Sequence, residues 1–117
     1  TAGQIPLVDG KLMATGKLGA EITVGHGAEI AQRCALNALA AVKSVIGDLD
    51  RVKQIVKVVG FVSSVPEFSS QPAVINGASE FLQQVFGDAG KHARSAVGVP
   101  VLPLDAPVEI ELIVEFS

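Results

Sequence analysis

The chain has 117 residues, of which 49% are hydrophobic and 18% charged, and its mean hydropathy is +0.47. These values predict one globular domain that closes its own core over residues 1–117, and they exclude a disordered chain. Charged or polar side chains interrupt every apolar stretch before it reaches the roughly 18 residues of a membrane span, so we expect no membrane partner. The formal net charge is -3, the wrong sign for a protein that neutralises phosphates, so we expect no nucleic-acid partner.

The cysteine content indicates a reducing compartment. Cys34 is the only cysteine, so the chain can form neither an internal disulfide nor a thiolate zinc cluster, and we expect a cytoplasmic protein. Its place among alanines predicts a packed, unreactive thiol. The sequence begins at Thr1 without Met and without a basic or apolar leader, so we expect no targeting signal in it and expect that residues upstream of Thr1 were removed or are not included.

Turn residues and helical spacing define the first half of the chain. Residues 1–17 read as a strand end followed by an irregular segment, with a turn at Asp9-Gly10. A helix is predicted from about Thr23 to Gly47, because apolar residues recur there at helical spacing and glycine often follows a helix. Its apolar stripe consists of Ala28, Ala31, Ala35, Ala38, Leu39, Val42, Val45 and Ile46.

Residues 52–63 are rich in β-branched side chains and predict a strand with both faces covered. Strict alternation puts Val52, Val56, Val58 and Val62 on one face, and Ile55, Val59 and Phe61 with Lys53 and Lys57 on the other. A second helix is predicted after Pro66, with Pro72 early in it and Gly87 after its end. Its stripe consists of Val74, Ile75, Ala78, Phe81, Leu82, Val85 and Phe86.

Two further strands are predicted, over residues 92–101 and 108–116. Crossover connections would place both helices on one face of a single mixed sheet, which predicts an α+β fold. The last strand would point Val108, Ile110, Leu112 and Val114 at the helices and leave Glu109, Glu111, Ile113 and Glu115 on the bare face. A bare face that is half apolar and half charged predicts a homo-oligomer.

A few residues could carry chemistry, and each has two interpretations. Arg94 is either a solvated strand end or a bidentate clamp for a carboxylate or phosphate. Glu109, with Glu111, forms either an outward charged face or a carboxylate pair that positions water. Asn76 is either a surface residue or a hydrogen-bonding partner for a group outside its helix.

The two histidines, His26 and His92, have no further ligand at metal-binding spacing. We therefore expect surface histidines and no metal site.

An ordered set of segments runs through nearly the whole chain: Gly3-Gln4-Ile5-Pro6, Asn37, residues 56–62, Asn76, residues 93–97 and residues 102–111. Together these segments resemble the RidA family, also called the YjgF family. The most specific part is an Arg-Ser pair at Arg94, a Leu-Pro pair at Leu102 and a Glu-Ile-Glu strand at Glu109. Ala96 stands where many relatives have Cys, tyrosine is absent, and the family's N-terminal segment is missing, so the resemblance is to a divergent subgroup.

The resemblance implies a chorismate-mutase-like α+β fold and a homotrimer with ligand clefts between subunits. Family members hydrolyse reactive enamines and imines, such as 2-aminoacrylate and related 2-imino acids, to 2-keto acids and ammonia without metal or organic cofactor. Carried to this sequence, Arg94 binds the substrate carboxylate with help from the backbone at Ala96, and Glu109 positions the attacking water. Gly3 and Asn76 belong to the same substrate site.

Two alternatives stay open at this point. A non-catalytic trimer could bind small carboxylates such as 2-keto acids in the same clefts, as a sensor or regulatory module. Some relatives carry a ribonuclease or translation-inhibitor role. The pI of about 5.2, the 4% aromatic content and the absence of a candidate histidine pair argue against that role here.

Overall fold

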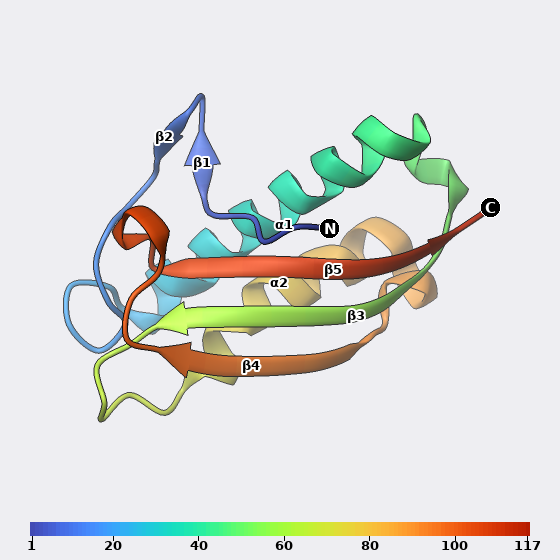
Figure 1. Ribbon diagram of the computed structural model, residues 1–117. Helices are drawn as coiled ribbons and strands as arrows, with labels where there is room; N and C mark the ends of the chain where they lie inside the picture. Colours follow the sequence, from blue (N-terminus) through green and yellow to red (C-terminus); the bar gives the residue numbers. More distant parts are fainter.

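The computed structural model describes residues 1–117, and two helices cover one face of its three-stranded sheet (Figure 1). Along the chain the elements are β1 (Leu7–Val8), β2 (Lys11–Leu12), α1 (Val24–Ile46), β3 (Val52–Ser63), α2 (Gln71–Phe86), β4 (Ala93–Val99) and β5 (Val108–Phe116). Short 3-10 helices lie at Leu49–Arg51, Gly87–Gly90 and Pro103–Asp105. The predicted α+β architecture is confirmed, with both helices on one face of a mixed sheet.

Strand β3 lies in the middle of the sheet, between β4 and β5. It runs parallel to β4, to which α2 connects it, and antiparallel to β5. Because side chains alternate between faces, each cross-strand row belongs to one side of the sheet. Three rows point away from the helices: Ala93-Lys57-Ile113, Ser95-Val59-Glu111 and Val97-Phe61-Glu109. Three rows point towards the helices: Arg94-Val58-Leu112, Ala96-Gly60-Ile110 and Gly98-Val62-Val108.

Both predicted helices have the ends that their sequence signals indicate. The Thr23 hydroxyl accepts the backbone N–H of His26 at 3.2 Å and so caps the start of α1. Gly47 follows α1 with φ 86°, a conformation that glycine adopts without strain, and its N–H donates to the Lys43 carbonyl at 2.8 Å. Gly87 has the equivalent place after α2, with φ 61°.

The hydrophobic core lies between the helices and the sheet, and the predicted stripes supply most of it. Two predicted stripe residues are exposed: Val45 is 80% exposed and Val85 is 47% exposed. Val45 lies next to the buried Ile46 and Val85 next to Phe86, which packs against the core, so each lies at the margin of a stripe that the neighbouring elements do cover. The expected burial of these two side chains was therefore wrong.

Strict alternation also fails in the first half of β3. Ile55 is fully buried on the helix side, whereas Val56 is 44% exposed. The pairing of β3 with β5 shifts register between Ile55 and Lys57, so a bulge inserts one residue and reverses the faces of Ile55 and Val56, and a second shift between Val52 and Gln54 returns Val52 to the helix side. The predicted assignment of Ile55 and Val56 was wrong for this reason, while that of Val58, Val59, Phe61 and Val62 holds.

The N-terminal segment is more regular than its sequence predicts. The turn at Asp9-Gly10 joins β1 and β2 into a two-residue hairpin, with φ values of 52° and 81°. The Asn37 amide fixes this segment to α1 by donating to the carbonyls of Ile5 at 3.1 Å and Leu7 at 3.0 Å. Asn37 is therefore a structural residue of the hairpin junction.

The Cys34 thiol is fully buried on α1 and contacts the Val108 carbonyl at 3.5 Å. Burial raises the pKa of this thiol well above its usual range, and the negative charge of Glu109 adds to the effect. The predicted packed thiol is confirmed. Neither helix combines the length and apolar character that crossing a membrane requires.

A close approach of the two helices gives a test of the packing. A Cβ atom at Gly77 would overlap the backbone carbonyl of Ala28, so Gly77→Ala is expected to lower the free energy of unfolding by about 2 kcal/mol. Gly25→Ala is the matched control, because it lies in α1 with open space around it and should stabilise by up to about 1 kcal/mol. Urea unfolding measures both changes. Equal effects of the two substitutions would contradict the described packing.

Candidate functional site

Arg94 is held on the helix side of β4 by two side chains of α2. One nitrogen of its guanidinium, Nη1, donates to Asn76 Oδ1 at 2.8 Å and to Ser79 Oγ at 3.2 Å. These two bonds use both hydrogens of Nη1. Nε and Nη2 have no hydrogen-bond or ion-pair partner in the chain. The guanidinium is therefore fixed in position, with one of its edges free.

The free edge has a defined chemical preference. Nε–H and one Nη2–H point in the same direction and match the two oxygens of a carboxylate or phosphate. A solvated strand end would need no fixed partners, so the contacts with Asn76 and Ser79 favour the interpretation of Arg94 as a clamp. Asn76 is exposed, and its side chain bonds to Arg94, a group outside its helix. This agrees with the interpretation of Asn76 as a hydrogen-bonding partner.

A shallow cavity of about 360 Å³ lies beside the guanidinium. It contains no hydrophobic residue, and its lining consists of Asn76, Ser79, Glu80, Gln83, His92 and Arg94. All of these residues come from α2 or from the beginning of β4 and the residue before it. The cavity is large enough for a small polar molecule but does not enclose one.

Ser79 and His92 belong to this cluster although the sequence interpretation did not select them. His92 is half-buried, with Nδ1 2.6 Å from the Gly90 carbonyl and Nε2 2.9 Å from Ser79 Oγ. The expectation of a surface histidine was therefore wrong for His92, because α2 packs over it, while His26 is exposed as expected. The sequence contains one sign of this cluster: Ser79 places a hydroxyl within the apolar stripe of α2, and a buried hydroxyl needs a polar partner.

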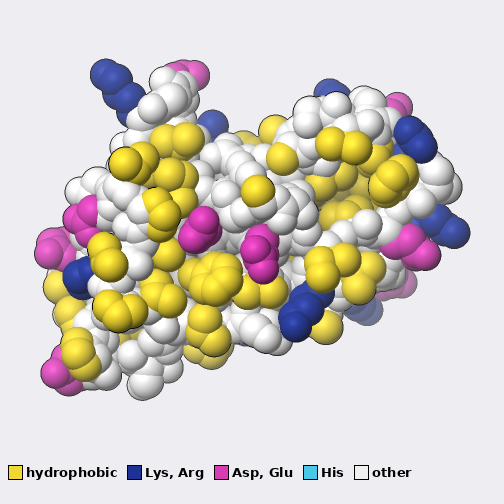
Figure 2. All heavy atoms as spheres, viewed as in Figure 1, with side chains coloured by type: hydrophobic (Ala, Val, Ile, Leu, Met, Phe, Trp, Pro, Cys, Tyr) yellow, Lys and Arg dark blue, Asp and Glu magenta, His cyan; other side chains and the backbone are white.

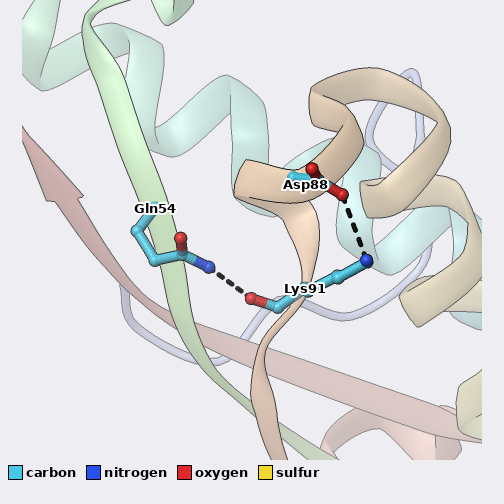
Figure 3. Close-up of polar contacts among 3 residues, drawn as sticks. All are labelled: Gln54, Asp88 and Lys91. Atoms are coloured by element: carbon cyan, nitrogen blue, oxygen red, sulfur yellow. Dashed lines mark hydrogen bonds and ion pairs between the residues drawn. The ribbon is translucent and has the colours of Figure 1, made fainter.

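The beginning of β4 is held in place from two sides. Figure 3 shows the Gln54 amide on β3 donating to the Lys91 carbonyl, and the Lys91 ammonium 3.0 Å from the Asp88 carboxylate. The Lys91–Asp88 pair is exposed and contributes little to stability. The bond from Gln54 ties the residue before His92 to the central strand.

Glu109 lies at a second location, on the bare face of β5. Gly3 crosses directly beside it, and a Cβ atom at Gly3 would overlap the Glu109 carboxylate. The crossing is fixed because Gln4 and Ile110 exchange two backbone hydrogen bonds, of 2.7 and 3.0 Å. Gly3 therefore leaves room for the carboxylate and limits where it can move.

The candidate residues therefore form two groups within one copy of the chain. Arg94 and Asn76 are in contact, and Ala96 follows two residues later on the same face of β4. Gly3 and Glu109 form the other group. The strands β4 and β5 flank β3, so two strand spacings, about 10 Å, separate the groups (Figure 1). The Arg94 and Glu109 side chains also leave opposite faces of the sheet, so one copy does not bring them together.

The bare face of the sheet is uncovered. Figure 2 shows hydrophobic side chains spread over β3, β4 and β5, with acidic side chains among them. Ile113 is 58% exposed and Val97 43%, while Glu109 and Glu111 are half-buried between the apolar neighbours. A surface of this composition is typical of one that another protein surface covers.

Residues 1–116 match the family described as "YjgF/chorismate_mutase-like, putative endoribonuclease". The chain belongs to this YjgF family. This confirms the resemblance to the RidA (YjgF) family that was based on the Arg-Ser, Leu-Pro and Glu-Ile-Glu segments.

Individual relatives place the chain within the YjgF family. Protein TCP17 of Trypanosoma cruzi is 46% identical over 99% of this chain and 73% of its own length. The crystal structure of Atu1372 from Agrobacterium tumefaciens, of unknown function, has 46% identity and a TM-score of 0.97 over 99% of this chain and 74% of its own. A "putative endoribonuclease" from Shewanella oneidensis has 37% identity and a TM-score of 0.96 over 99% and 77%.

A more distant family member has a crystal structure with serine bound. Escherichia coli TdcF, with bound serine, shares 28% identity and a TM-score of 0.57 over 100% of this chain and 79% of its own. The first two structures thus superpose on this chain much more closely than TdcF does. No group of three or more His, Cys, Asp or Glu side chains in the chain could hold a metal ion.

Proposed function

We propose that this protein hydrolyses small 2-imino acids to 2-keto acids and ammonia, at sites that neighbouring copies of the chain build together. The observation that carries the proposal is the free Nε–Nη2 edge of Arg94, held by Asn76 and Ser79. An immobile guanidinium with an open bidentate edge suits a planar carboxylate. The reaction class is the one that the resemblance to the RidA family implies, hydrolysis of small 2-imino acids, each of which carries such a carboxylate.

The proposed role of Arg94 is to bind and orient. The carboxylate of a 2-imino acid is bonded directly to the carbon of the C=N group, so fixing the carboxylate also fixes the electrophilic carbon. A protonated imine is already a strong electrophile. Much of the rate gain can therefore come from holding the carbon at a defined distance from a water molecule.

The proposed role of Glu109 is to handle protons. Its carboxylate accepts a proton from water as the water oxygen bonds to the iminium carbon, which gives a carbinolamine. The protonated carboxyl then returns that proton to the nitrogen. The C–N bond breaks and ammonia leaves, while the hydroxyl group loses its proton and becomes the C=O group. The iminium ion and one water thus become one 2-keto acid and one ammonium ion. General base catalysis of this kind contributes about 10²- to 10⁴-fold.

The proposed assembly is a homotrimer in which the edge strand β4 of one copy meets the bare face of the next. Strand β4 has an unpaired outer edge, because the order in the sheet is β4-β3-β5. Arg94 lies on that edge strand, and Glu109 lies on the half-apolar face that water alone does not suit. Contact between copies would therefore cover the apolar surface and bring the two functional groups to one cleft. The one cysteine, free and buried, favours a reducing compartment such as the cytoplasm.

The direct experiment generates 2-imino acids from amino acids with an amino-acid oxidase and follows their conversion to 2-keto acids. Purified protein is expected to accelerate keto-acid formation above the spontaneous rate. The filtrate that remains after the protein has been unfolded and removed serves as the control for metal ions and other small-molecule contaminants. An unchanged rate with alanine, serine and 2-aminobutanoate as oxidase substrates would contradict the proposal.

A second candidate function is binding of small carboxylates without turnover. The bound serine in TdcF favours it, because serine presents a carboxylate and no imine. Isothermal titration with 2-oxobutanoate separates the two candidates. Binding that depends on Arg94, with no acceleration for any imine, would favour the carboxylate-binding module over the enzyme.

Gly3 gives a prediction that is specific to the proposed water site. Gly3→Ala is expected to lower kcat about tenfold, because the added methyl overlaps the Glu109 carboxylate and displaces it. Stability should change little, since Gly3 is exposed and its φ is not in the left-handed region. Gly25→Ala, in open space on α1, is the control for a glycine substitution. Unchanged kcat in Gly3→Ala would mean that the position of Glu109 is not critical.

A further inference from the structure

We infer that Ser79 and His92 form a hydrogen-bond relay whose role is to position Arg94, so that both are positioning residues for the carboxylate site. The inference rests on the proposed function for its kinetic readout, but the relay is built from contacts within one copy of the chain. In order, the relay runs from the Gly90 carbonyl through His92 and Ser79 to Arg94.

The direction of each bond follows from the chemistry of its partners. The Gly90 carbonyl can only accept, so His92 Nδ1, 2.6 Å away, carries a hydrogen and donates it. In the neutral imidazole, Nε2 is then an acceptor, and the Ser79 hydroxyl, 2.9 Å away, donates to it. With its hydrogen directed at His92, Ser79 Oγ presents its lone pairs to Arg94 Nη1 at 3.2 Å.

The relay prevents a second orientation of the Ser79 hydroxyl, in which Arg94 would lose its bond to Ser79. A serine inside a helix commonly turns its hydroxyl back to the carbonyl four residues earlier. His92 gives the hydroxyl a better acceptor on the other side and so keeps Oγ at the guanidinium. Asn76 holds the second hydrogen of Nη1, and the two acceptors together fix the plane of the guanidinium. The orientation of the free Nε–Nη2 edge therefore depends on His92, which does not touch that edge.

The fold holds the far end of the relay firmly. Gly90 is buried, and a Cβ atom there would overlap the Leu82 carbonyl of α2. Gln54 fixes the carbonyl of the next residue, Lys91, to β3 (Figure 3). The segment that carries the Gly90 carbonyl thus packs against α2 and is hydrogen-bonded to the central strand at the next residue, which limits how far this end of the relay can move.

The test uses Ser79→Ala, His92→Phe and the double variant in the keto-acid assay. Each single substitution removes one link, and we expect each to raise KM about tenfold, the cost of one lost bond to a charged group, with a smaller fall in kcat because Arg94 orients the substrate as well as binding it. The double variant is expected to resemble either single variant rather than to show about a hundredfold effect, because the three groups act as one chain. Ser79→Thr retains the hydroxyl and should restore KM to within about threefold.

Controls separate this relay from a structural role. Lys91→Ala changes the exposed neighbour of His92 and should leave KM unchanged. Thermal unfolding checks that each variant folds; alanine is a good helix former, so Ser79→Ala keeps the test open if His92→Phe does not fold. Multiplicative effects in the double variant, or a loss of kcat with unchanged KM, would overturn the inference.

The same variants distinguish failure of the relay from failure of the proposed reaction. If the wild-type protein accelerates no imine hydrolysis, its affinity for 2-oxobutanoate is measured by titration instead. The relay then predicts the same pattern in Kd: a loss of about tenfold for each single variant, no further loss in the double variant, and recovery in Ser79→Thr. Wild-type affinity in Ser79→Ala would overturn the relay whatever the reaction is.

Discussion

Replacing Arg94 by alanine is expected to lower kcat/KM for 2-imino acids by about 10²- to 10³-fold, the largest effect of any single substitution on substrate binding. The substitution removes both N–H donors of the free edge and the only positive charge of the polar cavity. Arg94→Lys retains the charge but cannot form two parallel hydrogen bonds, so we expect about a tenfold to hundredfold loss. Both variants should fold, because Asn76 is exposed and the buried Ser79 hydroxyl retains His92 as its hydrogen-bonding partner when Arg94 is replaced.

Initial rates of keto-acid formation over a range of imine concentrations provide the measurement. Arg51→Ala is the matched control, because it also removes one guanidinium, which lies over the Phe116 ring at the far end of the sheet. The control should retain kcat/KM within about twofold. If Arg94→Ala retained wild-type kcat/KM, the carboxylate clamp would be wrong, and with it the assignment of the polar cavity.

Glu109→Gln is expected to lower kcat by about 10²- to 10⁴-fold and to leave KM within a few-fold of wild type. Glutamine has the shape of glutamate but cannot accept the proton of water at neutral pH. It therefore removes the chemical step without removing the contact with Gly3. The carboxylate of the substrate is bound elsewhere, by Arg94, so its affinity should be retained.

Glu111→Gln is the matched control for this experiment. Glu111 lies two residues further along β5, on the same face, in the row formed with Val59 and Ser95. The substitution changes the charge of the bare face by the same amount, and we expect kcat within about threefold of wild type. Equal losses in the two variants would indicate that face charge or assembly, rather than a positioned base, is responsible.

Much of the fold was predictable because the chain follows simple periodicities. The 3.6-residue spacing of apolar residues and the terminal glycines gave both helices, and strict alternation in β5 gave the correct face for every residue from Val108 to Glu115. The bulge in β3 was not predictable, because it depends on pairing with β5 and leaves no local signal at Ile55. The exposure of Val45 likewise depends on which neighbours reach the end of α1.

The sequence supplied some candidates for the site, but neither the geometry that relates them nor the contribution of Ser79 and His92. Arg94, Asn76, Gly3 and Glu109 follow from the family resemblance, and alternation alone assigns a face to each strand residue. The separation of Arg94 from Glu109 required the strand order β4-β3-β5 and the register across it. His92 was missed because a histidine next to a glycine-rich link has no periodic pattern to reveal that α2 covers it.

The central claim is that a working site takes Arg94 from one copy and Glu109 from its neighbour, and mixed assemblies test it directly. Arg94→Ala and Glu109→Gln chains with different affinity tags are co-expressed, and assemblies that carry both tags are isolated. In each mixed trimer, one of the three shared sites combines two unmodified residues, so we predict recovery of about a third of wild-type activity from two inactive variants. If both residues served the same copy, every site would carry one defect, and activity at the level of the separate variants would contradict the account.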